Sequence, residues 1–293
     1  MMNENEAINN QMSSLSVSDH IAMKLTDHQR QRLEKPTDSA WNWPVDKPDI
    51  KVGFQVGLSG PGIYSVYLDY IIDNPMTEAL SVSTDVERWA DWVPTCHKLN
   101  NMTAELGEND WHQVGQIIIK LPLVFLPKKY KVREILLSGQ YFTDETDKDA
   151  LFMTFITHPG DDIPLPKGVP AECRMSMPDG ISRIYPVVDK ATGRHQTRIT
   201  VFCDLDPKLP LPEGPIWGAF LSWLFNKIVP FAMRAFRKQA SVVHKKGLVT
   251  PLSQALVAYA KTGLSFPSAL LFRAGNQESV PVSEHGSDDD LEC

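Results

Sequence analysis

The amino-acid sequence predicts an α+β fold in which a curved antiparallel β-sheet packs against one long C-terminal α-helix. Between residues 98 and 205 the chain is a succession of strand-length runs, several of which alternate apolar and polar residues. The links between these runs have hairpin length, which favours antiparallel pairing over helical crossovers. The segment from Pro215 to His244 instead has helical periodicity and carries proline in its first turn.

The N-terminal part predicts two helices and two strands. Pro36 ends the first helix, because proline rarely continues one. Trp41 and Trp43 lie in a loop that leads into the strands, and a Gly-Pro-Gly turn starting at Gly60 separates the two strands. The expected elements are a helix over 18–35, strands over 50–58 and 63–73, and a helix over 76–89.

The remaining elements follow from alternation, turn residues and helical spacing. The predicted strands cover residues 98–106, 111–121, 129–137, 150–158, 171–177, 180–188 and 196–205. Helices are expected over 215–244 and 250–261.

Composition divides the 293 residues into four segments. Residues 1–16 are polar and are expected to be disordered, residues 17–246 form one domain, and residues 247–273 form a short amphipathic extension. Residues 274–293 have the composition of a disordered acidic tail.

The net charge of −7 is unevenly distributed. Residues 214–273 carry eight basic side chains and no acidic one, whereas residues 274–293 carry six acidic side chains and no basic one. A basic, apolar segment is attracted to anionic surfaces such as phospholipid headgroups, although a solvated helix face explains the same composition.

The long C-terminal helix has two different faces. One face, expected to pack against the sheet, carries Trp217, Leu221, Leu224, Ile228, Phe231 and Ala235. The opposite face carries Lys227, Arg234, Lys238 and Lys245 and continues into Phe220 and Trp223. Lys227 near the middle makes a membrane span costly, and Pro230 should kink or weaken the helix.

Motifs of common enzymes are missing. The chain has no GxSxG, P-loop, GxGxxG or HExxH pattern, so we expect no catalytic residues, no metal and no cofactor. Basic and aromatic residues do not alternate in the strands as nucleic-acid binding would favour. Four widely spaced cysteines and an N-terminus without an apolar stretch indicate reduced thiols in a cytoplasmic protein.

The residues around the first predicted sheet strands carry a family resemblance. The runs Val66 to Leu80 and Asp85 to Pro94, with Trp41-Asn-Trp43 before them, Pro127-Lys-Lys-Tyr130 after them and the closing helix, occur in an order and spacing that resemble START (steroidogenic acute regulatory protein-related lipid transfer) domains. The resemblance covers residues 17–246 and implies a helix-grip fold with a lipid cavity between sheet and C-terminal helix.

The resemblance implies a monomeric, non-enzymatic lipid carrier or sensor that touches anionic membranes peripherally. The implied lipid-binding residues are Trp111, Ile117, Ile119, Tyr130, Val132, Glu134, Leu136, Leu221, Leu224, Ile228 and Phe231. The implied membrane-docking residues are Phe220, Trp223, Lys227, Arg234 and Lys238.

Some features depart from the family pattern. Lys128-Lys129 stands where members commonly have Arg-Asp, and adjacent Arg133 and Glu134 cannot both face a cavity, because neighbouring strand residues point to opposite faces. The apolar neighbours of Glu134 favour Glu134 as the inward residue. A helix-grip enzyme and a regulatory adaptor with a filled core remain alternatives, and phospholipid, sterol and ceramide remain possible ligands, with the basic stripe favouring phospholipid.

Overall fold

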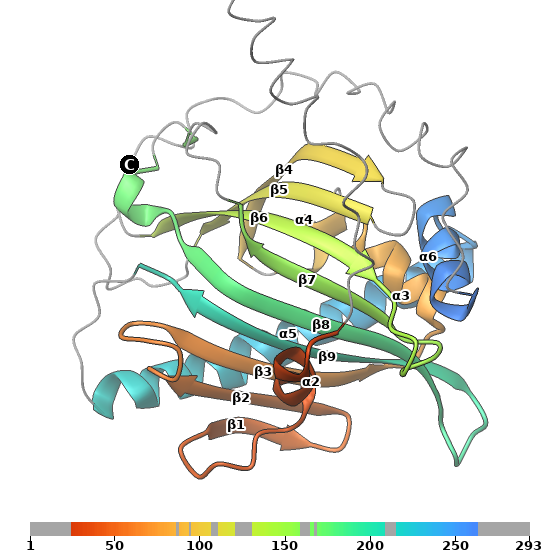
Figure 1. The fold of residues 1–293 in the computed structure, drawn as a ribbon, viewed down its shortest axis with the longest axis horizontal. Helices are drawn as coiled ribbons and strands as arrows, with labels where there is room; N and C mark the ends of the chain where they lie inside the picture. The colour runs from red at the N-terminus through yellow and green to blue at the C-terminus, as the bar shows by residue number, and fades with distance from the viewer. Residues whose placement is uncertain are drawn as a thin grey trace, which may run out of the picture.

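A computed structural model describes residues 25–85, 88–93, 95–106, 111–120, 131–158, 165–166, 169–208 and 215–262. Nine strands form one antiparallel sheet in the order β1-β2-β3-β9-β8-β7-β6-β5-β4 (Figure 1). The strands are β1 (Asn42–Lys47), β2 (Ile50–Val56), β3 (Tyr64–Ile72), β4 (Cys96–Leu106), β5 (Trp111–Lys120), β6 (Val132–Phe142), β7 (Leu151–Thr157), β8 (Ser176–Val188) and β9 (His195–Asp206).

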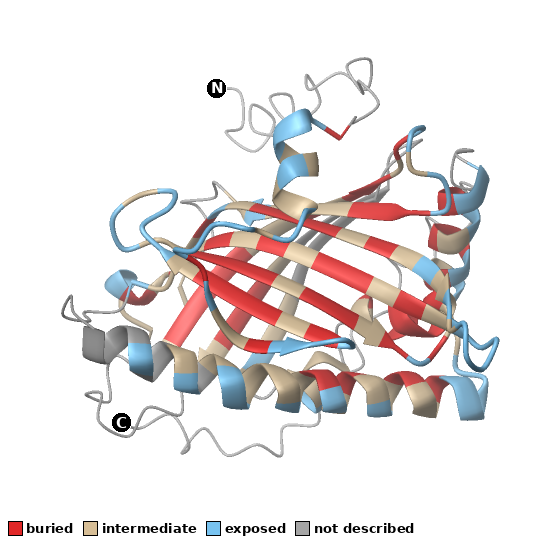
Figure 2. Cartoon of the chain, turned by 90° about the horizontal axis from the view of Figure 1, so that it is seen from below, coloured by how far each residue is buried: buried red, intermediate tan, exposed pale blue. Residues whose placement is uncertain are grey.

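The helices lie on opposite faces of this sheet. The short helix α2 lies against one face and the long helix α5 runs along the other (Figure 2). We call the α5 side the inner face and the α2 side the outer face. The helices are α2 (Asp27–Leu33), α3 (Met76–Ser83), α4 (Trp89–Trp92), α5 (Pro215–Lys246) and α6 (Pro251–Thr262), with a 3-10 turn η4 (Ala171–Cys173).

Local sequence explains the helix ends. Thr26 caps α2 through a capping box. Its side chain accepts a hydrogen bond from the Gln29 N–H, and the Gln29 side chain accepts one from the Thr26 N–H. Pro215 begins α5, and Gly247 follows it with a φ of 64°, a left-handed conformation that suits glycine at a helix end.

The predicted α+β architecture is confirmed, with four corrections to its elements. Residues 42–47, expected in a loop, form the edge strand β1. The expected helix over 76–89 is two separate helices, α3 and α4. The two strands expected over 171–177 and 180–188 are the turn η4 followed by one continuous strand, β8. The described part of the first expected helix is limited to α2, and its residues 18–24 lie outside the described residues.

The inner and outer faces have separate apolar cores. The largest core joins the inner face to α3, α5 and α6 through residues such as Tyr70, Leu80, Phe236 and Leu256. The outer core is aromatic and lies under the N-terminal segment, with Trp41, Tyr67, Phe142, Phe152 and Phe202. Helix α6 therefore contributes buried side chains to the inner core.

Candidate functional site

Strand register assigns each residue of β6 to a face. Tyr141 belongs to the inner core and Phe142 to the outer core, so odd-numbered residues of β6 face α5 and even-numbered residues face away. The β5–β6 register is continuous, with Trp111 opposite Tyr141 and Ile119 opposite Arg133. The odd-numbered positions of β5 therefore share the inner face.

The inward residue of the adjacent pair is Arg133, so the prediction for Glu134 is wrong. Arg133 is fully buried on the inner face, and its Nη1 donates to the Val132 carbonyl at 3.1 Å and lies 2.8 Å from Cys173 Sγ. The apolar neighbours of Glu134 misled the prediction, because the outer face of β6 is also buried. Val132 and Leu136 share the outer face with Glu134, so their predicted inward orientation is wrong as well.

Glu134 has a structural role on the outer face. Its carboxylate accepts hydrogen bonds from Arg174 Nε at 2.7 Å and Nη2 at 3.1 Å, and from Gln116 Nε2 at 3.1 Å. Gln116 in turn accepts a bond from Asn100 at 2.8 Å. These contacts tie the segment after η4 to strands β4, β5 and β6.

Two of the predicted lipid contacts, Ile117 and Ile119, lie on the inner face and pack with the cluster of Ile135, Met175 and Met177. Trp111 holds an inner-face position in the register, and Tyr130 lies outside the described residues. For Leu221 and Leu224 the structure describes the backbone of α5, and Ile228 is half-buried.

The inner face changes character along a single strand. On β9, inner-face Thr197 and Ile199 are buried, whereas Val201, Cys203 and Leu205 further along are only partly buried. The outer-face residues between them, Phe202 and Asp204, are 3% and 1% exposed. A helix-covered face normally buries its apolar residues best, so this reversal indicates looser packing between this half of the sheet and α5.

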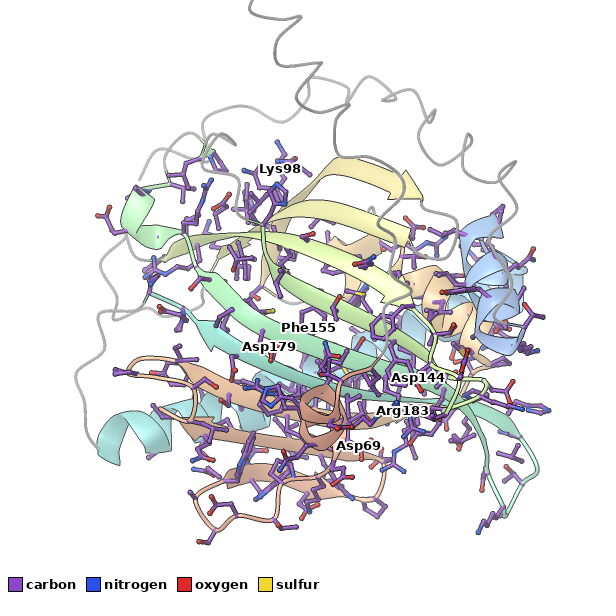
Figure 3. The ribbon with its side chains drawn as sticks, viewed as in Figure 1. Asp69, Lys98, Asp144, Phe155, Asp179 and Arg183 are labelled. Atoms are coloured by element: carbon purple, nitrogen blue, oxygen red, sulfur yellow. The ribbon has the colours of Figure 1, made fainter. Side chains whose placement is uncertain are left out.

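The same half of the inner face has other partly buried apolar side chains. Neighbouring strands contribute Leu68 from β3, Leu137 from β6, and Met153 and Phe155 from β7. Phe155 is labelled in Figure 3 near the middle of the sheet.

Two further residues describe the surroundings of this half of the inner face. Among the described residues, a Cβ added at inner-face Gly115 would meet no atom within 4 Å. The thiol of Cys203 is partly accessible, yet burial, with smaller effects of Asp204 and Asp179, raises its pKa to about 12.

Polar chemistry is concentrated on the outer face. Asp69, Asp144, Asp179 and Arg183, labelled in Figure 3, all form ion pairs there. The described inner-face positions of β2, β3 and β5 to β9 include no carboxylate, and His195, their one imidazole, is exposed at the start of β9. No cluster of three or more metal-ligating side chains occurs among the described residues.

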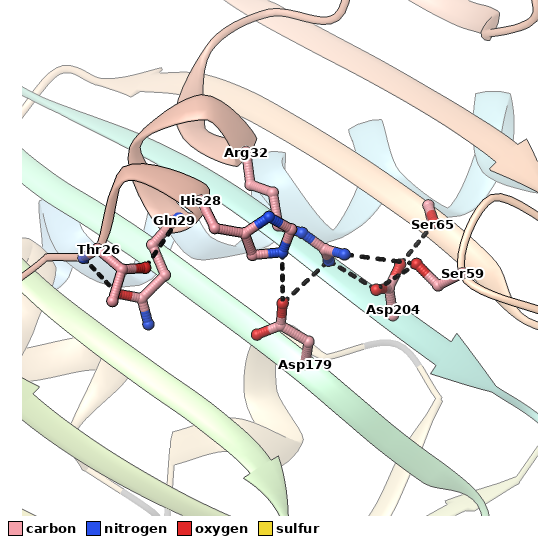
Figure 4. A network of polar contacts seen from close by, with 8 residues as sticks. All are labelled: Thr26, His28, Gln29, Arg32, Ser59, Ser65, Asp179 and Asp204. Atoms are coloured by element: carbon pink, nitrogen blue, oxygen red, sulfur yellow. Dashed lines mark hydrogen bonds and ion pairs between the residues drawn. The ribbon is translucent and has the colours of Figure 1, made fainter.

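An outer-face network fixes α2 and the β2–β3 hairpin. Arg32 of α2 donates to Asp204 Oδ2 at 2.6 Å and forms an ion pair with Asp179 at 3.0 Å (Figure 4). Ser59 and Ser65 of the hairpin donate to the same Asp204 carboxylate at 2.7 and 2.5 Å. The outer face is thus closed by satisfied polar contacts, while the inner face is mostly apolar apart from buried Arg133.

Helix α5 buries a different stripe from the predicted one. Its buried residues are Met233, Phe236, Ala240 and Val243, and Phe225, Val229 and Ala232 pack against the same core. Phe231, predicted to contact lipid, is 53% exposed, because it lies half a turn away from Met233. It joins Trp223, which is 56% exposed, on the outside of the helix.

The exposed outside of α5 alternates aromatic and basic side chains. At spacings of three and four residues it carries Trp223, Lys227, Phe231, Arg234 and Lys238, all exposed, which we call the outer stripe. Phe220 lies among the residues whose side chains are not described. No helix within the described ranges is long and apolar enough to cross a membrane.

Polar anchors of α5 are concentrated in its C-terminal half. Arg237 donates to the Ile71 carbonyl at 2.9 Å and to Asp49 at 2.9 Å, Ser241 donates to Asn74 at 3.3 Å, and His244 lies 2.8 Å from Glu78. In the N-terminal half, Phe225 stacks on Phe54 with ring centroids 5.2 Å apart. Pro230 separates the two halves.

Comparison with known proteins shows the fold. No family model and no curated protein matches the sequence. Human STARD10 superposes with a TM-score of 0.56 at 16% identity, covering 85% of this chain and 93% of its own. Human StAR-related lipid transfer protein 5 gives a TM-score of 0.53 at 10% identity, covering 80% and 98%. The chain has the START helix-grip fold, which confirms the architecture that the sequence motifs predicted.

Proposed function

We propose that this protein holds one lipid between the inner face of the sheet and the N-terminal half of α5, and exchanges it at membranes. The observation that carries the proposal is the change along β9 from buried Ile199 to partly buried Val201, Cys203 and Leu205. Apolar side chains left accessible inside a helix-grip fold provide the surface that acyl chains or a sterol would cover. One of the similar structures is a human StAR-related lipid transfer protein.

The energetics of lipid transfer favour such an enclosed site. Each methylene exposed to water costs about 0.8 kcal/mol, so a diacyl lipid with about 30 methylenes would cost on the order of 20 kcal/mol free in solution. Exchange through water is therefore negligible, and a carrier has to shield the chains. The inner face is apolar enough to do so, and its lack of paired acid and base among the described positions favours binding over catalysis.

We further propose that the outer stripe of α5 docks the protein on anionic membranes. Trp223 and Phe231 supply amphipathic or apolar anchors at the interface, while Lys227, Arg234 and Lys238 attract anionic headgroups. The half of α5 before Pro230 then moves to admit the lipid, because the shorter polar contacts among the described residues lie in the other half, whereas Ser222 makes only a 3.5 Å contact with Asn42.

The test is mass spectrometry of the organic extract from protein purified natively out of cells. One lipid class recovered at about one molecule per chain supports the carrier and identifies its ligand. A protein without lipid that also takes none from liposomes would overturn the proposal and favour an adaptor with a filled core.

A cavity-filling variant locates the site. Gly115→Phe places a ring in the open space on the inner face and should strongly reduce lipid recovery without unfolding the protein. Ile156→Phe is the matched control, because Ile156 is 44% exposed on the outer face of β7. Equal lipid recovery from the two variants would place the ligand elsewhere.

A further inference from the structure

The outer stripe of α5 belongs to a segment with an extreme charge imbalance. Helix α5 carries six lysine and arginine side chains and no acidic one. The described ion pairs of this helix use Arg237 and His244, which lie on the side facing Asp49 and Glu78. The stripe cations Lys227, Arg234 and Lys238 occur in no ion pair within the described part of the chain.

The chain supplies a complementary segment outside the described residues. Residues 274–293 carry Glu278, Glu284, Asp288, Asp289, Asp290 and Glu292 and no lysine or arginine. We propose that this acidic segment binds the outer stripe of α5 and competes there with anionic membrane. The inference rests on the proposed docking function and adds a regulator to it.

The connection is long enough for this contact. Helix α6 follows α5 after a four-residue link and packs on α3, at the same end of the molecule as the C-terminal end of α5 (Figure 1). An extended chain from Thr262 to Glu278 reaches about 50 Å at roughly 3.3 Å per residue. The 32 residues of α5 span about 48 Å. The acidic segment can therefore reach the whole outer stripe.

Tethering makes weak ion pairs sufficient. An exposed ion pair contributes little by itself, but the covalent connection through residues 263–277 keeps the acidic segment at an effective concentration of order millimolar near the stripe. Several such pairs compete with a membrane surface that attracts the same cations. Both contacts are electrostatic, so salt should weaken both.

The first experiment measures binding of the full chain to phosphatidylcholine–phosphatidylserine vesicles. Deleting residues 274–293 should raise the affinity at least about fivefold at low salt, since a few surface cations become available to the membrane. A full-length variant with Asp288→Asn, Asp289→Asn, Asp290→Asn and Glu292→Gln should reproduce much of this gain, which separates charge from length. Unchanged affinity in both variants would overturn the proposal.

A second arm separates direct contact from general repulsion. In a chain with Lys227→Gln, Arg234→Gln and Lys238→Gln, removal of the acidic segment should raise vesicle affinity by much less. An undiminished gain would mean that the acids repel the membrane without touching α5, and would overturn the proposal.

A third arm needs no membrane, so it distinguishes this proposal from the docking function. A carbodiimide joins carboxylates to lysine amines that are in contact, and mass spectrometry should find links from residues 278–292 to Lys227 or Lys238 in the full chain. If these links form but no variant binds vesicles, the docking function fails and the intramolecular contact stands. If vesicles bind but no such link forms, the intramolecular contact fails alone.

Discussion

The two halves of α5 differ in how they pack against the same sheet. After Pro230, the helix buries Met233, Phe236, Ala240 and Val243 and is anchored by Arg237. Before Pro230, it faces inner-face residues such as Leu68 and Cys203 that remain partly buried. The comparison teaches that one continuous helix can be anchored firmly at one end and packed more loosely at the other, where the proposed function places the lipid.

The largest difference between the halves should appear in stability. Phe236 is 1% exposed and packs edge-on against Trp92 with ring centroids 4.7 Å apart, so Phe236→Ala should cost about 3–5 kcal/mol through the cavity it leaves. Phe231→Ala should cost less than about 0.5 kcal/mol, because Phe231 is exposed. Urea unfolding of both variants checks the contrast, and similar losses would contradict the assignment of faces.

Glycine substitutions test the sheet below the helix. A Cβ at Gly180 would lie 2.4 Å from the ring of Phe155 and 2.6 Å from its carbonyl oxygen, so Gly180→Ala should cost about 1–3 kcal/mol. Gly115→Ala has open space and should be neutral or slightly stabilising, because alanine restricts the unfolded chain. Thermal unfolding distinguishes the two. A loss at Gly115 as large as that at Gly180 would argue against open space at Gly115.

The hydrogen bonds of Arg237 should contribute less to the free energy of unfolding than the apolar packing of α5 does. Arg237→Gln removes hydrogen bonds to the Ile71 carbonyl and to Asp49, and should cost about 1–2 kcal/mol. Lys238→Gln, one residue later on the exposed side, is the matched control and should be near neutral. Amide exchange after Pro230 should accelerate in Arg237→Gln alone, and equal rates in both variants would rule out an anchoring role.

The outer face supplies a pH-dependent reference that is independent of α5. Burial opposes ionisation of Asp144, but hydrogen bonds from Thr146, Arg30 and the Leu25 N–H outweigh it and lower its pKa to about 2. Its contribution, about 1 kcal/mol after solvent screening, is present above the unfolded pKa near 4 and is lost as pH falls toward 2. Asp144→Asn should flatten that part of the stability profile, and an unchanged acid limb would refute the assignment.

The sequence predicted the sheet and the closing helix because alternation and helical spacing are local signals. It missed β1, in which Pro44 interrupts the pattern, and it misassigned the inward residue of β6. Both faces of β6 are buried, so Leu136 and Ile135 are apolar alike, and their side-chain types do not show which face each one occupies. Only the pairing of β6 with β5 and β7 assigns each residue to a face. The predicted stripe of α5 was displaced for a similar reason, since apolar residues occur on several sides of its N-terminal half and fix no unique face.

The central claim is that the half of α5 before Pro230 covers a lipid that the other half does not touch. Amide hydrogen exchange across residues 215–246, with the protein loaded with its extracted lipid and after delipidation, tests this most directly. We expect residues 215–229 to exchange faster than 233–246 without lipid, and lipid to slow only the first group. Exchange that is uniform along the helix and indifferent to lipid would contradict the account.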